Sequence, residues 1–171
     1  NDNIYFMVEC EKDIKDSKDM KAWKHFCTIT HHKYLVAKGC FAVGLYWQGL
    51  MHDMSKYSFT EFRVGAKYFQ GTRSPNNAEK EDIGYSSAWL HHKGRNKHHY
   101  EYWLDYSSHE GDGIVPVEMP DQYLVEMFID RVSASKNYNK GHYTDDMPLK
   151  YFLKGKSYAL MHDKTREKLE F

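Results

Sequence analysis

Apolar residues recur at helical spacing along most of this chain, and this periodicity constrains the fold more than any other feature of the sequence. No stretch alternates apolar and polar residues in the series expected of β-strands, and no internal repeat divides the chain. A length of 171 residues is that of one domain with one hydrophobic core. The sequence therefore predicts an all-α helical bundle, a single domain over residues 1–171, with its core at about 20–137 and C-terminal helices in 147–171.

Start and stop signals divide this pattern into segments. Residues 21–43 are expected to form two helices, because Thr30 is a candidate N-cap within them and Gly44 a candidate stop. Ser58 and Glu61 have the spacing of a capping box, which predicts a helix from there to about Phe69. Further helical pieces are expected at 45–56, 86–92, 97–106, 120–135 and 147–171, with loops at 71–79, 107–119 and 137–146 and a leader or short helix at 1–16.

The composition excludes several classes of protein. Apolar residues make up 41% and charged residues 28%, which is typical of a folded soluble domain and not of a disordered or fibrous chain. Lys and Arg number 24 and Asp and Glu also 24, so the formal charge of zero does not indicate a nucleic-acid-binding protein. The apolar runs are too short to span a membrane, and three cysteines without C-x-x-C spacing favour reduced thiols in a cytoplasmic protein.

Histidine is the unusual part of the composition, with eleven residues, several of them in adjacent pairs. Such an excess indicates metal or proton chemistry. The sharpest set is His32, His52, Asp53 and Asp130, which come from three predicted helices and can converge on one ion in a bundle. Imidazole and carboxylate ligands together suit a divalent transition metal, namely iron, manganese, zinc, cobalt or nickel.

Asp130 is the most informative member of this set, because its neighbours from 125 to 132 are mainly apolar. A carboxylate that faces a core loses hydration and needs compensation. A metal ion would supply it, and so would an ion pair with Lys136 or with an arginine of another helix. We favour the metal, and the ion pair remains the purely structural alternative.

The His52-Asp53 pair is a weak signal taken alone, since the chain has a second such pair, His162-Asp163, in a charged stretch near the C-terminus. The context of the first pair differs, because Gly49-Leu-Met-His52-Asp53-Met-Ser-Lys56 has an apolar approach and a lysine three residues after the aspartate. We interpret His162-Asp163 as an exposed face or a helix cap and treat it as an internal control.

Residues 30 to 135 resemble the HD-domain superfamily of metal-dependent phosphohydrolases. His32-x-x-x-Val36-Ala37 is similar to the helix of the first histidine in that superfamily, His52-Asp53 to the pair that names it, and Asp130 to the final aspartate ligand. His52-Asp53-Met-Ser-Lys56 also resembles the HD-GYP form, in which the lysine faces the substrate. The resemblance implies an HD-domain-like helical bundle of a small HD-related family that hydrolyses a nucleotide or other small phosphoester.

A second cluster is the run His91-His92-Lys93-Gly94-Arg95-Asn96-Lys97-His98-His99, with four imidazoles and three cations in nine residues. Binuclear HD enzymes have extra histidines between the pair and the final aspartate. The resemblance therefore implies a second ion, held by one of His91 and His92 and one of His98 and His99. A solvated basic turn is the alternative. The chain lacks the His-His-Glu and Gly-Tyr-Pro signatures of HD-GYP proteins, so a cyclic-dinucleotide substrate is not supported.

These features predict a mechanism for a small phosphorylated substrate. One or two divalent ions would lower the pKa of bound water and generate the hydroxide that attacks phosphorus. Lys56, Arg95 and Lys97 would stabilise charge on the transferring phosphoryl group, and Asp53 would bridge the ions or orient the water. Two alternatives use the same ligands: a di-iron oxygenase of HD type, and a metal-stabilised module that binds phosphate or nucleic acid without turnover.

Overall fold

The computed structural model describes residues 18–170, and the leader or short helix expected at 1–16 lies outside the described residues. The elements in chain order are α2 (Lys18–Ala42), α3 (Tyr46–Met51), the 3₁₀ helix η2 (Met54–Tyr57), α4 (Phe59–Lys67), α5 (Pro75–Ile83), α6 (Ser87–Lys93), the 3₁₀ helix η3 (Tyr100–Tyr102), β1 (Leu104–Tyr106), β2 (Ile114–Pro116), α7 (Asp121–Tyr138), α8 (Met147–Gly155) and α9 (Asp163–Glu170). Helices dominate this part of the chain, so the prediction of an all-α fold is confirmed.

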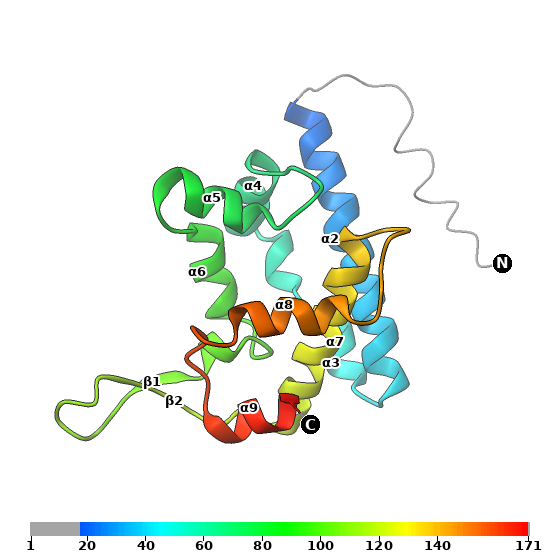
Figure 1. Ribbon diagram of the computed structural model, residues 1–171. Helices are drawn as coiled ribbons and strands as arrows, with labels where there is room; N and C mark the ends of the chain where they lie inside the picture. The colour runs from blue at the N-terminus through cyan, green and yellow to red at the C-terminus, as the bar shows by residue number, and fades with distance from the viewer. Residues whose placement is uncertain (1–17, 171) are drawn as a thin grey trace.

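The long helix α2 organises the bundle (Figure 1). It packs against α3, α4 and α7, while α4 in turn packs against α5 and α6. The C-terminal helices α8 and α9 both pack on α7, where Met119, Leu124, Met127 and Met161 form a buried cluster. No helix within residues 18–170 combines the length and the apolar character that crossing a bilayer requires.

The predicted division of residues 21–43 into two helices is wrong, because α2 runs without a break for 25 residues. The Thr30 hydroxyl does not cap a helix, since it lies 3.1 Å from Tyr57 Oη on the neighbouring η2 segment. Continuity matters for the site, because side chains spaced by three or four residues share one face of a helix. His25, Ile29, His32 and Val36 have this spacing, and all four are buried on the face that meets the rest of the bundle.

The capping box is confirmed, because the Ser58 side chain accepts a hydrogen bond from the Glu61 N–H and α4 begins at the next residue. The prediction of a loop at 71–79 is wrong for its second half. Pro75 opens α5 there, at the first helical turn, where the fixed φ of proline and its missing N–H are tolerated.

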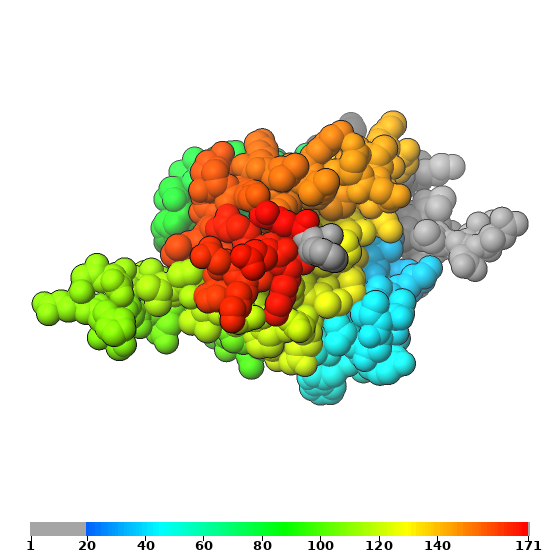
Figure 2. All heavy atoms as spheres, turned by 60° about the horizontal axis from the view of Figure 1, so that its bottom comes forward, coloured from blue at the N-terminus to red at the C-terminus, as the bar shows by residue number. Residues whose placement is uncertain are grey.

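The prediction of a helix at 97–106 is also wrong. Its place is taken by η3 and by β1, which pairs antiparallel with β2 through Leu104 opposite Pro116 and Tyr106 opposite Ile114. The hairpin projects from the body of the molecule at one side (Figure 2). Strands of three residues are too short for a period-2 pattern to be recognised, which explains the error.

Glu79, on α5, anchors the start of α6. Its carboxylate is buried and accepts hydrogen bonds of 2.6 Å from both the Ser86 and the Ser87 hydroxyls. The Ser86 hydroxyl accepts in turn from the Trp89 N–H, so one buried carboxylate orients the cap of the next helix. The position of α6 is therefore fixed through polar contacts at its first turn.

We expect Glu79→Ala to lower the free energy of unfolding by about 2–3 kcal/mol, because two hydroxyl donors lose a buried, charged acceptor. Urea unfolding of the metal-free protein measures the loss. Glu81→Ala is the matched control on the same helix, since it removes a solvent-screened surface pair with Arg73 and should cost clearly less stability than Glu79→Ala. Equal losses in the two variants would contradict the anchoring role.

Candidate metal centre

Seven side chains gather in two groups of potential metal ligands that share Asp53. In each group one ligand atom from every residue lies within 4.8 Å of the others. The first group consists of His32 on α2, His52, Asp53 and Asp130 on α7, and the second consists of Asp53, His92 on α6, His98 and His99. Residues from distant parts of the sequence therefore converge on one buried carboxylate.

The two oxygens of Asp53 face different groups. Oδ2 lies 3.3 Å from His52 Nε2 and 3.8 Å from His32 Nε2. Oδ1 lies 3.2 Å from His92 Nε2 and 3.3 Å from His98 Nε2. A carboxylate placed in this way can bridge two cations, one on each oxygen.

Asp130 and His99 complete the groups. Asp130 Oδ1 lies 2.9 Å from His32 Nε2 and 3.6 Å from His52 Nε2, and its Oδ2 lies 4.0 Å from His98 Nε2 of the second group. In the second group, His99 Nε2 lies 2.9 Å from His92 Nε2. Two imidazole nitrogens facing each other at this distance are readily explained as two ligands of one ion, since both can then use their lone pairs.

Ligand atoms account for most of the buried polar atoms that lack a hydrogen bond. Within the described residues these atoms are Nε2 of His32, His52 and His98, both carboxylate oxygens of Asp53, and Nδ1 of His25. Two of them have a close charged neighbour, since Asp53 Oδ2 pairs with Lys56 and His32 Nε2 faces Asp130. Buried polar groups are nearly always hydrogen-bonded, and a cluster of exceptions calls for an explanation such as an ion. Five of these six atoms belong to the two groups, so the residues fit a metal centre.

The backbone turns sharply where it presents His52 and Asp53. Helix α3 ends at Met51, and Asp53 adopts φ 54°, the one positive φ of a residue other than glycine in 18–170. This conformation costs about 1–2 kcal/mol, and aspartate tolerates it better than most residues. Lys33 Nζ donates to the carbonyl oxygens of Leu50 and His52 at 2.5 and 2.9 Å, which holds the turn against α2. The turn brings two consecutive side chains to one centre.

Glu126 orients one histidine from each group. Its Oε1 accepts hydrogen bonds from Nδ1 of both His52 and His98, at 2.9 and 3.1 Å. With Nδ1 as donor, Nε2 of each ring carries the lone pair that a metal requires. His52, His98 and Glu126 also form a compact set through these atoms, which we interpret as orientation of ligands and not as a third ion site. Glu126 lies one helical turn before Asp130 on α7. It could have been found in the sequence as a second carboxylate on the helix face of Asp130.

Glu61 has the same role for His92, whose Nδ1 lies 2.8 Å from Glu61 Oε2. The other oxygen contacts His91 Nδ1 at 2.6 Å. His91 therefore lies outside both ligand groups, which corrects its place in the predicted metal set. The reason is geometric, since consecutive residues of α6 point about 100° apart and only His92 faces Asp53. In the sequence, Glu61 was recognisable only as part of a capping box.

The ligands of the centre titrate in opposite directions. Burial opposes the charge of His52, His92 and His98, but neighbouring carboxylates raise the pKa of all three imidazoles, so a metal ion would have to displace their protons. Burial opposes the charge of Asp53, but His52 and Lys56 hold the pKa of this carboxyl well below its usual range. Burial, together with two neighbouring imidazoles, lowers the pKa of His99 well below its usual value. Metals bind the carboxylate and the neutral imidazole, so both residues are in the ligating form near neutral pH.

The three predicted phosphate-binding cations lie in different environments. Lys56 is 2.6 Å from Asp53 Oδ2 and its side chain is 30% exposed, so it belongs to the centre. Arg95 and Lys97 are exposed on the turn between the buried His92 and His98. Within the part of the chain that the structure describes, neither contacts the two groups. Arg95 donates to the His91 carbonyl, and Lys97 lies over two tyrosine rings.

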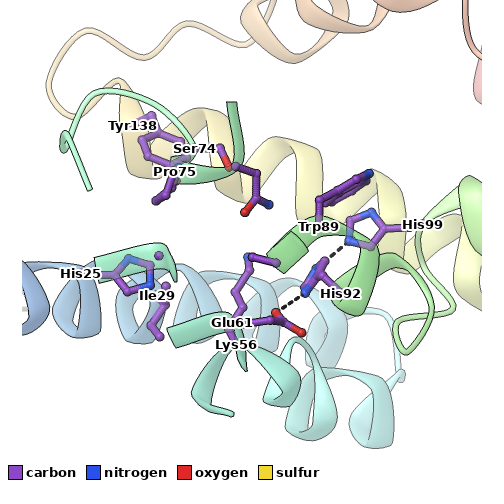
Figure 3. A pocket seen from close by; sticks show the side chains of 13 residues that line it. His25, Ile29, Lys56, Glu61, Ser74, Pro75, Trp89, His92, His99 and Tyr138 are labelled. Atoms are coloured by element: carbon purple, nitrogen blue, oxygen red, sulfur yellow. Dashed lines mark hydrogen bonds and ion pairs between the residues drawn. The ribbon is translucent and has the colours of Figure 1, made fainter. Parts of the chain in front are cut away.

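A pocket of about 110 Å³ adjoins the second group (Figure 3). His92 and His99 lie at one end, His25 and Ile29 at the other, and Lys56 between them. His25 packs against α4, where any side chain at Gly65 would collide with its ring. The pocket therefore connects the ligand groups to a buried imidazole on α2.

Burial, and secondarily the charge of Lys56, lowers the pKa of His25 to about 4. The unfolded chain takes up this proton below about pH 6.5 and the folded protein does not, so stability falls as the pH drops toward 4. We expect the metal-free protein to lose about 2 kcal/mol more than His25→Leu between pH 7 and 4.5, measured by urea unfolding at both pH values. Parallel losses in the two proteins would assign this pH dependence to other groups.

Comparison with known protein families places the chain in one of them. The sequence pattern of DUF5662, a family of unknown function, matches residues 21–171. Neither the curated proteins nor the solved structures provide a match to the chain. The matched range contains all seven ligand residues and both orienting carboxylates. The chain therefore belongs to the DUF5662 family.

Proposed function

We propose that this protein is a metal-dependent phosphohydrolase that cleaves a small phosphoester with a metal-activated water. The observation that carries the proposal is the position of Asp53, whose two oxygens face two ligand groups and whose Oδ2 also pairs with Lys56. Paired ions on such a carboxylate suit phosphoryl transfer, which needs charge stabilisation at both the attacking and the leaving oxygen. The resemblance of His32, His52-Asp53 and Asp130 to the HD-domain pattern supports the same reaction class.

The ligand set suits a divalent transition metal such as iron, manganese, zinc, cobalt or nickel, because it combines imidazoles with carboxylates and contains no thiolate. His32, His52 and Asp130 would hold one ion with Asp53, and His92, His98 and His99 would hold the other. When bound, such ions lower the pKa of water toward 7 and withdraw charge from a phosphoryl oxygen. Glu126 and Glu61 keep three of the imidazoles in the ligating tautomer.

Lys56 is the residue that we assign to the phosphoryl group. Burial lowers the pKa of its amine, but Asp53 and Asp130 raise it above its usual value, so Lys56 stays protonated. Its side chain lines the pocket beside His92 and His99. A fixed ammonium group there hydrogen-bonds a phosphoryl oxygen and stabilises the negative charge of the transition state. Arg95 and Lys97, which are exposed elsewhere, are not part of this proposal.

The test is elemental analysis of the purified protein combined with phosphate release. We expect two equivalents of metal per chain and hydrolysis of phenyl phosphate that disappears after chelation and returns on adding manganese, iron, cobalt, nickel or zinc. Iron with oxygen uptake and no phosphate release would instead favour a di-iron oxygenase. Bound metal without turnover, and phosphate binding that weakens with salt, would favour a binding module. A chain that takes up no metal under any of these conditions would refute the metal centre itself.

A further inference from the structure

The pocket beside the second ligand group contains polar side chains that are not used by the fold. Ser74, Asn76 and Tyr138 all line it, and their side chains make no hydrogen bond within residues 18–170. His25 lies at the far end, 6% exposed, with Nδ1 buried and without a partner. A fully buried polar group without a partner is costly in a folded protein, and His25 Nδ1 is such a group. Ser74, Asn76 and Tyr138 are half-buried and line the same cavity, so all four side chains can hydrogen-bond a ligand that enters it.

The charges of the pocket limit what that ligand can carry. Among the thirteen residues that line it, the charged side chains Lys56 and Glu61 lie with His92 at the end that adjoins Asp53 and the ligand groups. Burial keeps His25 neutral, because it lowers the pKa of this imidazole to about 4. Tyr138 is a neutral donor, because burial raises the pKa of its phenol above the ordinary value. The far end of the pocket therefore suits a neutral group that both donates and accepts hydrogen bonds, and not a second phosphate or carboxylate.

Ring contacts argue against a nucleobase. The cavity, about 110 Å³ and partly open to solvent, has room for a sugar ring. Trp89 is the indole that a base would stack on, but it is already engaged. The Lys80 amine lies 5.5 Å from its ring centre and the His99 ring 4.8 Å away, edge to face.

We infer that this pocket is the leaving-group subsite and that it binds a sugar or polyol, so that the substrate is a sugar or polyol monophosphate. The inference rests on the proposed function, because it places the phosphoryl group at Lys56 and the two ligand groups. Hydroxyl groups match Ser74, Asn76, Tyr138 and His25 because each hydroxyl both donates and accepts. Water attacks phosphorus, the bond from phosphorus to the sugar oxygen breaks, and that oxygen leaves as a hydroxyl after taking up a proton, which gives inorganic phosphate and the free sugar.

The first experiment compares substrates that differ only in the leaving group, with the metal-reconstituted full chain. The probes are ribose 5-phosphate, glucose 6-phosphate, phenyl phosphate, adenosine 5′-monophosphate and fructose 1,6-bisphosphate. We expect kcat/KM for one or both sugar monophosphates to exceed the values for the other three by at least about tenfold. Equal or better hydrolysis of the nucleotide, of phenyl phosphate or of the bisphosphate would overturn the inference and leave the phosphohydrolase proposal intact.

The second experiment assigns the selectivity to the pocket. Tyr138→Phe and Asn76→Ala each remove one unpaired polar group, so we expect the ratio of kcat/KM for sugar phosphate over phenyl phosphate to fall about three- to tenfold. Asn77→Ala is the matched control, because Asn77 is the exposed neighbour of Asn76 and does not line the pocket. Metal content and melting temperature confirm that the variants are folded. A ratio unchanged in both pocket variants would overturn the inference.

Direct binding separates this inference from the proposed function. If no substrate is hydrolysed, the proposed function fails, and calorimetry on the manganese-loaded protein still tests the pocket. We then expect glucose 6-phosphate or ribose 5-phosphate to bind at least about tenfold tighter than inorganic phosphate, and Asn76→Ala to reduce this advantage about three- to tenfold. Equal binding of sugar phosphate and inorganic phosphate would refute the sugar subsite.

Discussion

Asp53→Asn is expected to empty both metal positions and to abolish turnover. Asp53 supplies one oxygen to each ligand group and is the one residue that both groups contain within the part of the chain that the structure describes. Asparagine keeps the shape and tolerates the left-handed backbone at this position, but it lacks the negative charge that two cations require. We expect metal per chain to fall from two equivalents to near zero and kcat to fall on the order of a thousandfold, measured by elemental analysis and by phosphate release.

The second His-Asp pair of the chain provides the control for this prediction. Asp163 opens α9 on the surface, and His162 Nδ1 accepts a hydrogen bond from the Lys164 N–H. Both residues lie outside the two ligand groups. His162→Ala and Asp163→Asn should therefore retain metal and activity, whereas His52→Ala should lose both. Equal effects at the two pairs would contradict the assignment of the centre.

Glu126→Gln is expected to weaken metal binding at both positions together. One oxygen of Glu126 accepts from His52 Nδ1 in the first group and from His98 Nδ1 in the second. Glutamine preserves the volume but removes the charge that makes these hydrogen bonds strong and the imidazoles basic. Loss of such a supporting partner typically costs 10- to 100-fold in metal affinity, so we expect about that increase in both dissociation constants.

Competition titration with a zinc chelator measures the two dissociation constants in the wild type and the variant. Glu118→Gln is the matched control, because it removes a carboxylate that pairs with Lys168 at the surface. That variant should bind both ions as the wild type does. If Glu126→Gln weakens only one of the two positions, the shared oxygen is not what orients both histidines.

The sequence predicted the parts of the centre that lie on strongly periodic helices. Asp130 was recognisable as a carboxylate among the apolar residues of α7, and His32 through the resemblance of His32-x-x-x-Val36-Ala37 to the HD-domain pattern. His52 and Asp53 were recognisable as a pair, but the left-handed turn that aims both at one point has no sequence signature apart from the tolerance of aspartate for it.

The supporting carboxylates and the turn after α6 were harder to predict. The Glu61 backbone does cap α4 as expected, but its side chain reaches across to α6, and this long-range contact is invisible to a local motif. His98 and His99 belong to the same ligand group although they are adjacent, because they lie outside α6 in irregular backbone. Periodicity is informative only within regular elements, so the side on which each cation and histidine of this turn lies could not be read from the sequence.

Proteolysis of the basic turn, residues 93–97, offers a way to follow the metal centre without any substrate. The exposed Arg95 and Lys97 are cleavage sites for trypsin, and they lie between two anchor points, His92 and His98. A metal ion held by His92, His98 and Asp53 would tie both anchors together and suppress the local opening that a protease needs. The rate of tryptic cleavage at this turn would then report whether the second ligand group holds an ion.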